Sequence, residues 1–153
     1  TLSLHDARPI YIEDHHLSRL ASSNITVAFC PRASTYFGHE GHRWKDMIAA
    51  GVAVALGTDS LLCLDTPDRI TVLDDMRLLY KRDQCDPKML FAMATIHGAV
   101  GLGLSPSLVM LDEGETAGLL SFDGICNNPL IEILESNIAP QWVLRGAISP
   151  KTT

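Results

Sequence analysis

The chain has 153 residues, of which 46% are hydrophobic and 20% are charged. This length and composition are typical of one globular domain with a hydrophobic core and not of a disordered chain. A formal net charge of −6 argues against a surface for nucleic acid or for an anionic membrane. No apolar run is long enough to cross a bilayer, so we expect a soluble protein.

The four cysteines are scattered along the chain, and no two of them form a C-x-x-C pair. This spacing disfavours a structural zinc knuckle, and a chain of this size does not need a disulfide scaffold. We therefore expect a reducing, cytoplasmic location.

The first ten residues, TLSLHDARPI, show no helical or strand periodicity and no signal-peptide pattern. Translating a common short-read sequencing adapter in one frame gives TLSLHDALPI, which differs only at Arg8. We therefore interpret residues 1–10 as an assembly artefact and expect the remainder to be a fragment of a longer chain.

The next residues alternate helical and strand-like patterns. Residues 13–22 are predicted to form an amphipathic helix, and 25–30 a buried strand that ends at a proline. Residues 31–41 are predicted to be a polar loop. An apolar stripe over 44–51 predicts another helix, with a glycine after its last turn. Residues 52–56 are apolar throughout, as in a strand that is covered on both faces.

The second half of the chain is predicted to begin with helices and to end with strands. Helical spacing covers residues 66–80, and a second helix is expected over 86–99. Beyond these helices, short apolar runs predict strands at 118–122, 131–134 and 141–144.

The alternation of helices and strands up to residue 108 predicts βαβ units around a parallel sheet. Such sheets carry functional groups at the carboxyl ends of their strands. Two polar segments follow predicted strands here, Cys30-Pro31-Arg32 and Gly57-Thr58-Asp59-Ser60.

The order of these motifs resembles the amidohydrolase superfamily, in its aminohydrolase, chlorohydrolase and cytosine-deaminase-like branch. The resemblance spans Tyr11 to Ala147. The segments that carry it are Cys30-Pro31-Arg32, Gly51 to Ser60, Met76-Arg77, Ala94 to Ala99 and Leu111 to Leu120. It implies an α/β fold in which residues 11–108 are the C-terminal βα units of a TIM-type (β/α)8 barrel. Residues 109–149 would be return strands of a small β-sandwich domain, and 150–153 a polar tail.

The resemblance also implies a divalent metal, zinc in many members, that activates a water for hydrolysis of a non-peptide carbon–nitrogen bond. Asp59 matches the aspartate that ligates the metal and transfers the proton, so it is the predicted catalytic residue and metal ligand. Thr58 and Ser60 would orient its carboxylate. The family's histidine ligands lie upstream, and one such position coincides with Arg8. A single ligand does not make a metal site, so the fragment alone is expected to be inactive.

Each candidate residue has a plainer alternative. Asp59 could close an Asx turn or cap a helix. His39, in a Phe-Gly-His stretch, could touch the substrate or could be solvated. Arg32 could bind an anionic substrate group or form a salt bridge at the rim. Asp74 and Asp75 match the charge preference of a helix N-terminus and suggest no further role.

The predicted function is therefore that of a fragment of a metal-dependent hydrolase, most plausibly a deaminase of a cyclic or amidine-like small molecule. A non-catalytic scaffold with the same fold is the alternative, and upstream histidines would decide between them. A complete doubly wound nucleotide-binding domain ranks last, because no glycine-rich strand-to-helix turn is present. The sequence leaves self-association into a homo-oligomer open.

Overall fold

The computed structural model describes residues 12–39, 41–66, 68–124 and 127–146. The predicted adapter segment 1–10 and the predicted tail 150–153 lie outside these ranges. In chain order the elements are α1 (Asp14–Ala21), β1 (Thr26–Phe29), α2 (Pro31–Tyr36), α3 (Trp44–Ala49), β2 (Ala53–Leu56), the 3-10 turn η2 (Leu61–Cys63), α4 (Val72–Asp83), α5 (Pro87–Ala94), α6 (Ile96–Gly101), the 3-10 turn η3 (Pro106–Val109), β3 (Gly118–Ser121), α7 (Pro129–Glu135) and β4 (Gln141–Arg145).

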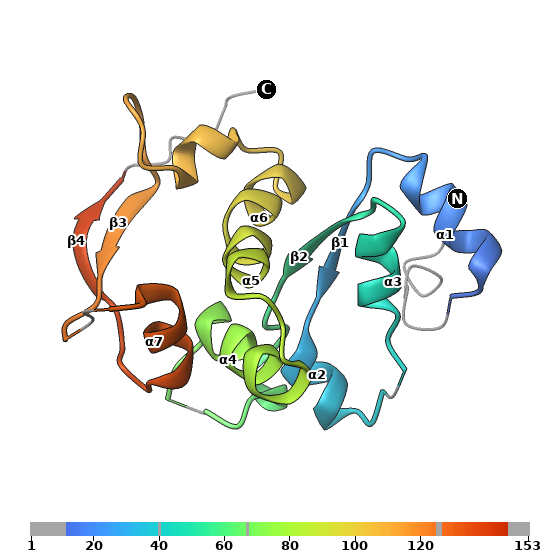
Figure 1. Ribbon diagram of the computed structural model, residues 1–153, viewed down its shortest axis with the longest axis horizontal. Helices are drawn as coiled ribbons and strands as arrows, with labels where there is room; N and C mark the ends of the chain where they lie inside the picture. Colours follow the sequence, from blue (N-terminus) through green and yellow to red (C-terminus); the bar gives the residue numbers. More distant parts are fainter. Residues whose placement is uncertain (1–11, 40, 67, 125–126, 147–153) are drawn as a thin grey trace.

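The chain has a mixed α/β architecture with two small sheets (Figure 1). Strands β1 and β2 pair in parallel, as the alternation of elements predicts, and β3 pairs with β4 in antiparallel fashion. Helices α5 and α6 lie between the two sheets, and α1 and α3 lie on the far side of β1 and β2. No helix within the described ranges is long and apolar enough to cross a membrane.

The parallel pair contributes four side chains to the core. Val27 lies opposite Val54 and Phe29 opposite Leu56, and all four side chains are buried. Residues in register on neighbouring strands point to the same face, so these four present one apolar surface. Side chains from α3, α4, α5 and α7 complete the cluster.

Helix α7 corrects the prediction of a strand at 131–134. Pro129 occupies a first-turn position, and the Glu132 carboxylate accepts hydrogen bonds of 2.8 Å from the amides of Asn127 and Asn128. These contacts satisfy amides that precede the helix. The apolar residues at 130, 131, 133 and 134 fit helical spacing as well as strand alternation, and the periodicity alone was ambiguous.

Three other predicted boundaries also change. Residues 31–36 form α2 instead of a loop, because proline is tolerated at a helix start. Helix α4 begins after Thr71, whose hydroxyl accepts from the Leu73 amide, and not near residue 66. The helix expected over 86–99 is interrupted at Thr95, whose backbone leaves the helical region at φ −118° and ψ −81°.

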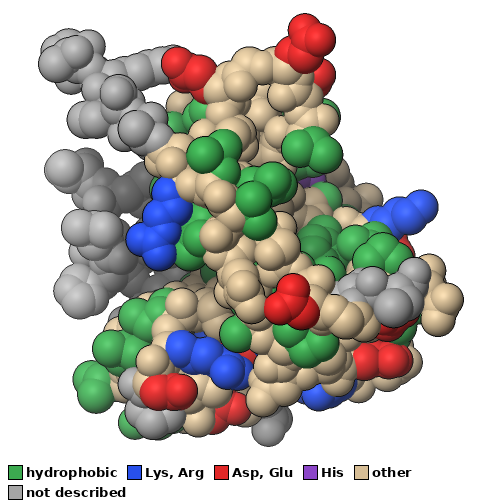
Figure 2. Space-filling model, turned by 90° about the vertical axis from the view of Figure 1, so that its left-hand side faces the viewer, with side chains coloured by type: hydrophobic (Ala, Val, Ile, Leu, Met, Phe, Trp, Pro, Cys, Tyr) green, Lys and Arg blue, Asp and Glu red, His purple; other side chains and the backbone are tan. Residues whose placement is uncertain are grey.

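Strands β3 and β4 confirm two of the three predicted C-terminal strands. Their apolar side chains remain exposed, including Leu119, Leu120 and Trp142. Figure 2 shows hydrophobic side chains on the face of the molecule that carries this ribbon. The division into a barrel portion and a small β-domain stays a prediction, although α7 packs with α4 and α5.

Replacing Leu134 with alanine tests the placement of α7. Leu134 is 0% exposed, so we expect Leu134→Ala to lower the free energy of unfolding by about 2–5 kcal/mol. Leu120→Ala, at a residue that is 43% exposed, is the matched control and should cost less than about 1 kcal/mol. Equal costs in urea unfolding would contradict burial of α7 in the core.

Candidate functional site

The parallel register brings the two polar segments together at one edge of the sheet. Phe29 lies opposite Leu56, and the amide of Gly57 donates to the carbonyl of Phe29 at 2.9 Å, so Cys30 stands beside Gly57. A Cβ atom on Gly57 would lie 2.9 Å from Cys30 Sγ, closer than such atoms pack. Glycine at this position therefore allows the turn that carries Asp59 to lie against the end of β1.

Asp59 is exposed and adopts a left-handed backbone conformation with φ +59°. Among the described non-glycine residues, only Gln84 shares a positive φ. This conformation is costly for most residues, and aspartate tolerates it better than most. Within the described ranges no group donates a hydrogen bond to the Asp59 carboxylate. The N-cap position of η2 is occupied by Ser60, so Asp59 does not cap that turn. The carboxylate therefore closes no local turn or cap, which weakens the alternative of a purely structural aspartate.

The neighbouring hydroxyls do not reach this carboxylate. Thr58 Oγ1 donates to the backbone carbonyl of Asp59 at 3.4 Å, and Ser60 Oγ lies 3.6 Å from Cys63 Sγ. These contacts stabilise the backbone of the turn. Support of the carboxylate by Thr58 and Ser60 stays a prediction.

Cys30 lies at the same edge, and its pKa is raised to about 11. Burial is the largest cause, followed by the negative charges of Asp59 and Asp75, while a hydrogen bond from the Asp59 amide opposes the shift. The group is therefore a protonated thiol near neutral pH. Cys30 is therefore suited to packing and not to nucleophilic attack.

Arg32 lies within a buried polar network. Its Nε donates to Asp75 Oδ2 at 3.0 Å, Nη1 donates to Thr66 Oγ1 at 2.9 Å, and Nη2 donates to the carbonyl of Thr71 at 3.0 Å. The Arg32 side chain is 5% exposed. These contacts favour the salt-bridge alternative over the prediction that Arg32 binds substrate, although the bridge is buried and not at an exposed rim.

The structure gives Asp74 and Asp75 roles that the sequence analysis missed. Asp75 is 0% exposed, and its Oδ1 also accepts from the Arg32 amide at 3.2 Å. A signal was present, because Asp75 falls in the buried stripe formed by Val72, Met76 and Leu79. An acidic residue in such a stripe requires a buried partner.

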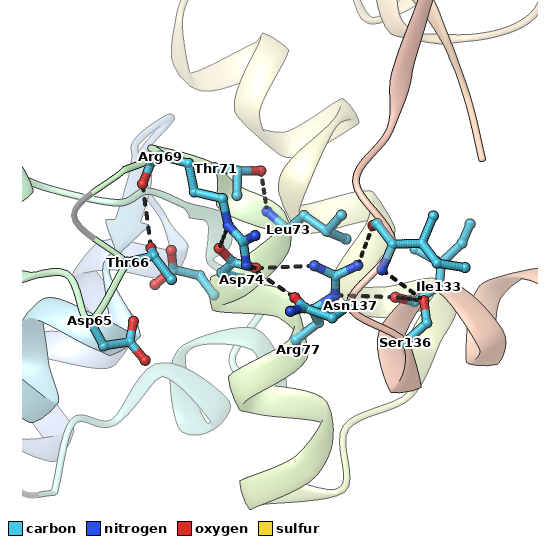
Figure 3. Close-up of polar contacts among 12 residues, drawn as sticks. Asp65, Thr66, Arg69, Thr71, Leu73, Asp74, Arg77, Ile133, Ser136 and Asn137 are labelled. Atoms are coloured by element: carbon cyan, nitrogen blue, oxygen red, sulfur yellow. Dashed lines mark hydrogen bonds and ion pairs between the residues drawn. The ribbon is translucent and has the colours of Figure 1, made fainter. Parts of the chain in front are cut away.

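Asp74 joins α4 to the segments on either side of it (Figure 3). Arg69 Nε approaches Asp74 Oδ2 at 2.8 Å, and Arg77 Nη1 approaches Oδ1 at 3.1 Å. Burial acts to raise the pKa of Asp74, but the hydrogen bonds from the two arginines outweigh it and lower that pKa. Arg77 also donates to the carbonyls of Ile133 and Ile138 at 3.2 and 2.7 Å, which ties α4 to α7 and the turn after it.

His39 lines a cavity to which the Asp59 turn does not contribute. It lines a cavity of about 450 Å³, and residues 57–60 are not among the lining residues. The cavity is bounded by Phe29, Ser34, Thr35, Gly38, His39, Gly41, His42, Trp44, Lys45, Arg82 and Asp83. The structure thus does not bring His39 and Asp59 into one pocket, and contact of His39 with substrate stays a prediction.

Two other histidines have packing roles. His42 stacks on Phe29 with ring centroids 4.3 Å apart, and burial, followed by the nearby His39, lowers its pKa. His97 Nδ1 lies 2.8 Å from the carbonyl of Val54. In a parallel pair, the backbone groups of one of two opposite residues point toward the partner strand and those of the other point away. Val27 points toward β2, so the carbonyl of Val54 points away from β1, and His97 contacts it there.

The described residues do not make a metal site by themselves. In the ranges that the structure describes, no three His, Cys, Asp or Glu side chains are grouped so that they could hold a metal ion. Asp59 offers one exposed carboxylate, which is a suitable ligand for a divalent cation. A site at this edge would need further ligands from elsewhere.

Comparison with known proteins places these motifs in a family context. A model described as "Amidohydrolase family" matches residues 4–148. The 5-methylthioadenosine/S-adenosylhomocysteine deaminase of Pyrococcus horikoshii is 34% identical over 108 residues, covering 67% of this chain and 26% of that protein. The corresponding Moorella thermoacetica deaminase is 31% identical over 122 residues, covering 76% and 28%.

Two more distant proteins are also similar. The S-triazine hydrolase of Gordonia rubripertincta is 24% identical over 122 residues, covering 76% of this chain and 26% of that protein. The structure of E. coli guanine deaminase shares the fold with a TM-score of 0.58 at 24% identity, covering 80% of this chain and 29% of that one. The chain thus spans only about a quarter of the length of the curated relatives it matches.

The reactivity of Cys30 tests the electrostatics of this edge. With a pKa of about 11, compared with 9.0 for an ordinary thiol, alkylation by iodoacetamide at pH 8 should be about 100-fold slower than for a free cysteine. Mass spectrometry of the labelled peptide measures the rate. Asp59→Asn should accelerate labelling, because it removes a nearby negative charge. An ordinary rate in the unmodified chain would contradict the burial of Cys30, and an unchanged rate in Asp59→Asn would contradict its placement beside Asp59.

Asp74 gives a prediction for acid stability. Because its pKa is lower in the folded chain than in the unfolded chain, its contribution is present above about pH 4 and is lost as the pH falls through the folded value. Asp74→Asn should reduce the free energy of unfolding at pH 7 by about 1.5–3 kcal/mol, and the difference should shrink toward pH 3. Urea unfolding of both proteins between about pH 3 and pH 7 measures this difference in the free energy of unfolding. A constant difference would argue against ionised Asp74 as the cause.

Proposed function

Because the chain belongs to the amidohydrolase family, we propose that it is the C-terminal portion of a longer metal-dependent hydrolase of non-peptide carbon–nitrogen bonds. In this proposal residues 11–108 supply the last βα units of a (β/α)8 barrel, and residues 109–149 supply part of a small β-domain. The activities for which the relatives are named favour a deaminase that acts on a cyclic or amidine-like small molecule.

The observation that carries the proposal is the placement of Asp59. Its exposed carboxylate follows a parallel strand, beside the end of the neighbouring strand, on a backbone in the left-handed region. Sparsely populated backbone conformations persist where surrounding structure imposes them, and they are enriched at active sites. The carboxylate also has no local structural task among the described residues.

We assign proton transfer to Asp59. Its carboxylate can accept a proton from the attacking water and return it to the leaving nitrogen, which is the general acid–base role for which a positioned carboxylate is suited. A divalent metal, zinc by analogy with the family, would activate the water and take Asp59 as one ligand. The remaining ligands would come from the preceding part of the longer protein.

The proposal extends to partners and location. The acidic net charge fits a small-molecule enzyme better than a protein that binds nucleic acid or an anionic membrane. We also propose a cytoplasmic location, which the scattered cysteines favour. Self-association into a homo-oligomer is compatible with the proposed function.

Asp59→Asn in the full-length protein that carries this segment is the direct test. Asparagine also tolerates the left-handed region, so we expect an unfolding free energy within about 0.5 kcal/mol of the unmodified protein. Loss of the proton-transfer group should lower kcat/KM by at least about 100-fold. Ammonia release from methylthioadenosine, guanine and triazine substrates with added zinc measures the activity.

Asp68→Asn is the matched control, because Asp68 is an exposed carboxylate in the same loop. It should leave ammonia release unchanged. Full activity in Asp59→Asn would contradict the catalytic assignment. A full-length protein that releases no ammonia from any of these substrates, with or without zinc, would favour the non-catalytic scaffold.

A further inference from the structure

The segment that carries Asp59 runs from Gly57 to the start of α4 at Val72, and in its described residues, 57–66 and 68–71, the only regular element is the short turn η2. Its described internal backbone hydrogen bonds are few, from Cys63 to Ser60, from Leu64 to Leu61 and from Arg69 to Thr66. Its anchoring therefore depends on contacts from the rest of the molecule.

Arg32 reaches this segment at three points. Its Nη1 donates to Thr66 Oγ1 at 2.9 Å and lies 3.4 Å from Asp65 Oδ1, and its Nη2 donates to the Thr71 carbonyl at 3.0 Å. Thr71 is the residue that caps α4. One planar guanidinium thus fixes the middle and the end of the segment, a geometry that a lysine ammonium cannot reproduce.

Asp75 in turn fixes Arg32. Its carboxylate accepts from both the Arg32 amide, at 3.2 Å, and Nε, at 3.0 Å, and Nη2 lies 2.9 Å from the same carboxylate. Arg32 is the third residue after β1, at the start of α2, so this pair joins the end of β1 to α4. The far end of the segment is tied as well, because Arg69 bonds to Asp74 and to Asn137 (Figure 3).

The charges of this network balance. Arg32 pairs with Asp65, Asp74 and Asp75, and Asp74 also pairs with Arg69 and Arg77. With its charge compensated and its donors engaged inside the molecule, Arg32 has little capacity left for an anionic substrate group. Its Nη1 and Nη2 atoms instead donate hydrogen bonds to the segment that begins with the Asp59 turn.

We propose that Arg32, held by Asp75, is a positioning residue that fixes the segment between β2 and α4 and thereby the orientation of the Asp59 turn. The link to catalysis rests on the function proposed above for Asp59. The mechanical part concerns this chain alone and is tested without any enzyme activity.

Hydrogen exchange of the 153-residue chain tests the mechanical part. In Arg32→Lys, peptides covering residues 58–71 should exchange about tenfold faster or more, as expected when hydrogen bonds to a charged group are lost. Peptides covering β1 and β2 should change less than about twofold. A role in general stability alone would instead accelerate exchange in the strands and in the segment together.

Two further variants keep the test decisive. Thr66→Val removes one acceptor of Arg32 with little change of shape, so it should loosen the same peptides even if Arg32 variants fold poorly. Arg43→Ala removes a guanidinium that pairs with Asp14 and Asp46, far from this segment in the chain, and should leave residues 58–71 unchanged. Unchanged exchange at 58–71 in both Arg32→Lys and Thr66→Val would overturn the proposal.

Kinetics of the full-length protein then test the catalytic link. A misplaced catalytic group should lower kcat by about 100-fold in Arg32→Lys while KM changes little. Faster exchange with unchanged kcat would overturn the positioning role and leave the function of Asp59 intact. An unmodified protein without deaminase activity would refute the proposed function instead, while the exchange result would still decide the anchoring of the segment.

Discussion

A buried guanidinium has to be compensated by charge and hydrogen bonds, and this requirement organises the carboxyl edge of the parallel sheet. Removing one partner of a buried ion pair costs about 3–5 kcal/mol, because the other charge stays uncompensated. Burial opposes the charge on Arg32, but the hydrogen bonds and charge of Asp75 outweigh it and raise the pKa of the guanidinium. The pair between Arg32 and Asp75 therefore locks α4 to the end of β1, and the connection that carries Asp59 is held between them.

Among the described residues, the candidate site combines a well-ordered sheet edge with one exposed carboxylate, that of Asp59. Asp59 is exposed, conformationally unusual and free of a local capping task among the described residues, whereas Cys30 beside it is a protonated packing thiol. One carboxylate can transfer a proton but cannot by itself hold a metal ion. This agrees with a chain that spans about a quarter of the length of its curated relatives.

Sequence patterns predicted the elements that are set by apolar spacing and end signals along the chain. The helix over Asp14–Ala21, the strands around Val27 and Val54, and the helix that ends before Gly51 appear as expected. The strand expected at 131–134 is a helix, because its apolar spacing fits both periods and the contacts of Glu132 with the preceding amides decide between them. The later start of α4 also has a tertiary component, since the Thr66 hydroxyl accepts a hydrogen bond from Arg32.

The sequence by itself determined the family motifs, their order and the position of Asp59 after an apolar strand, because these depend on neighbours along the chain. Only the tertiary structure decided the role of Arg32, which binds Asp75 43 residues away instead of presenting its charge to solvent. It also placed His39 at a cavity that residues 57–60 do not line. The physical reason is that burial and charge compensation arise between segments distant in sequence, so local spacing cannot show which charged side chain remains available for chemistry.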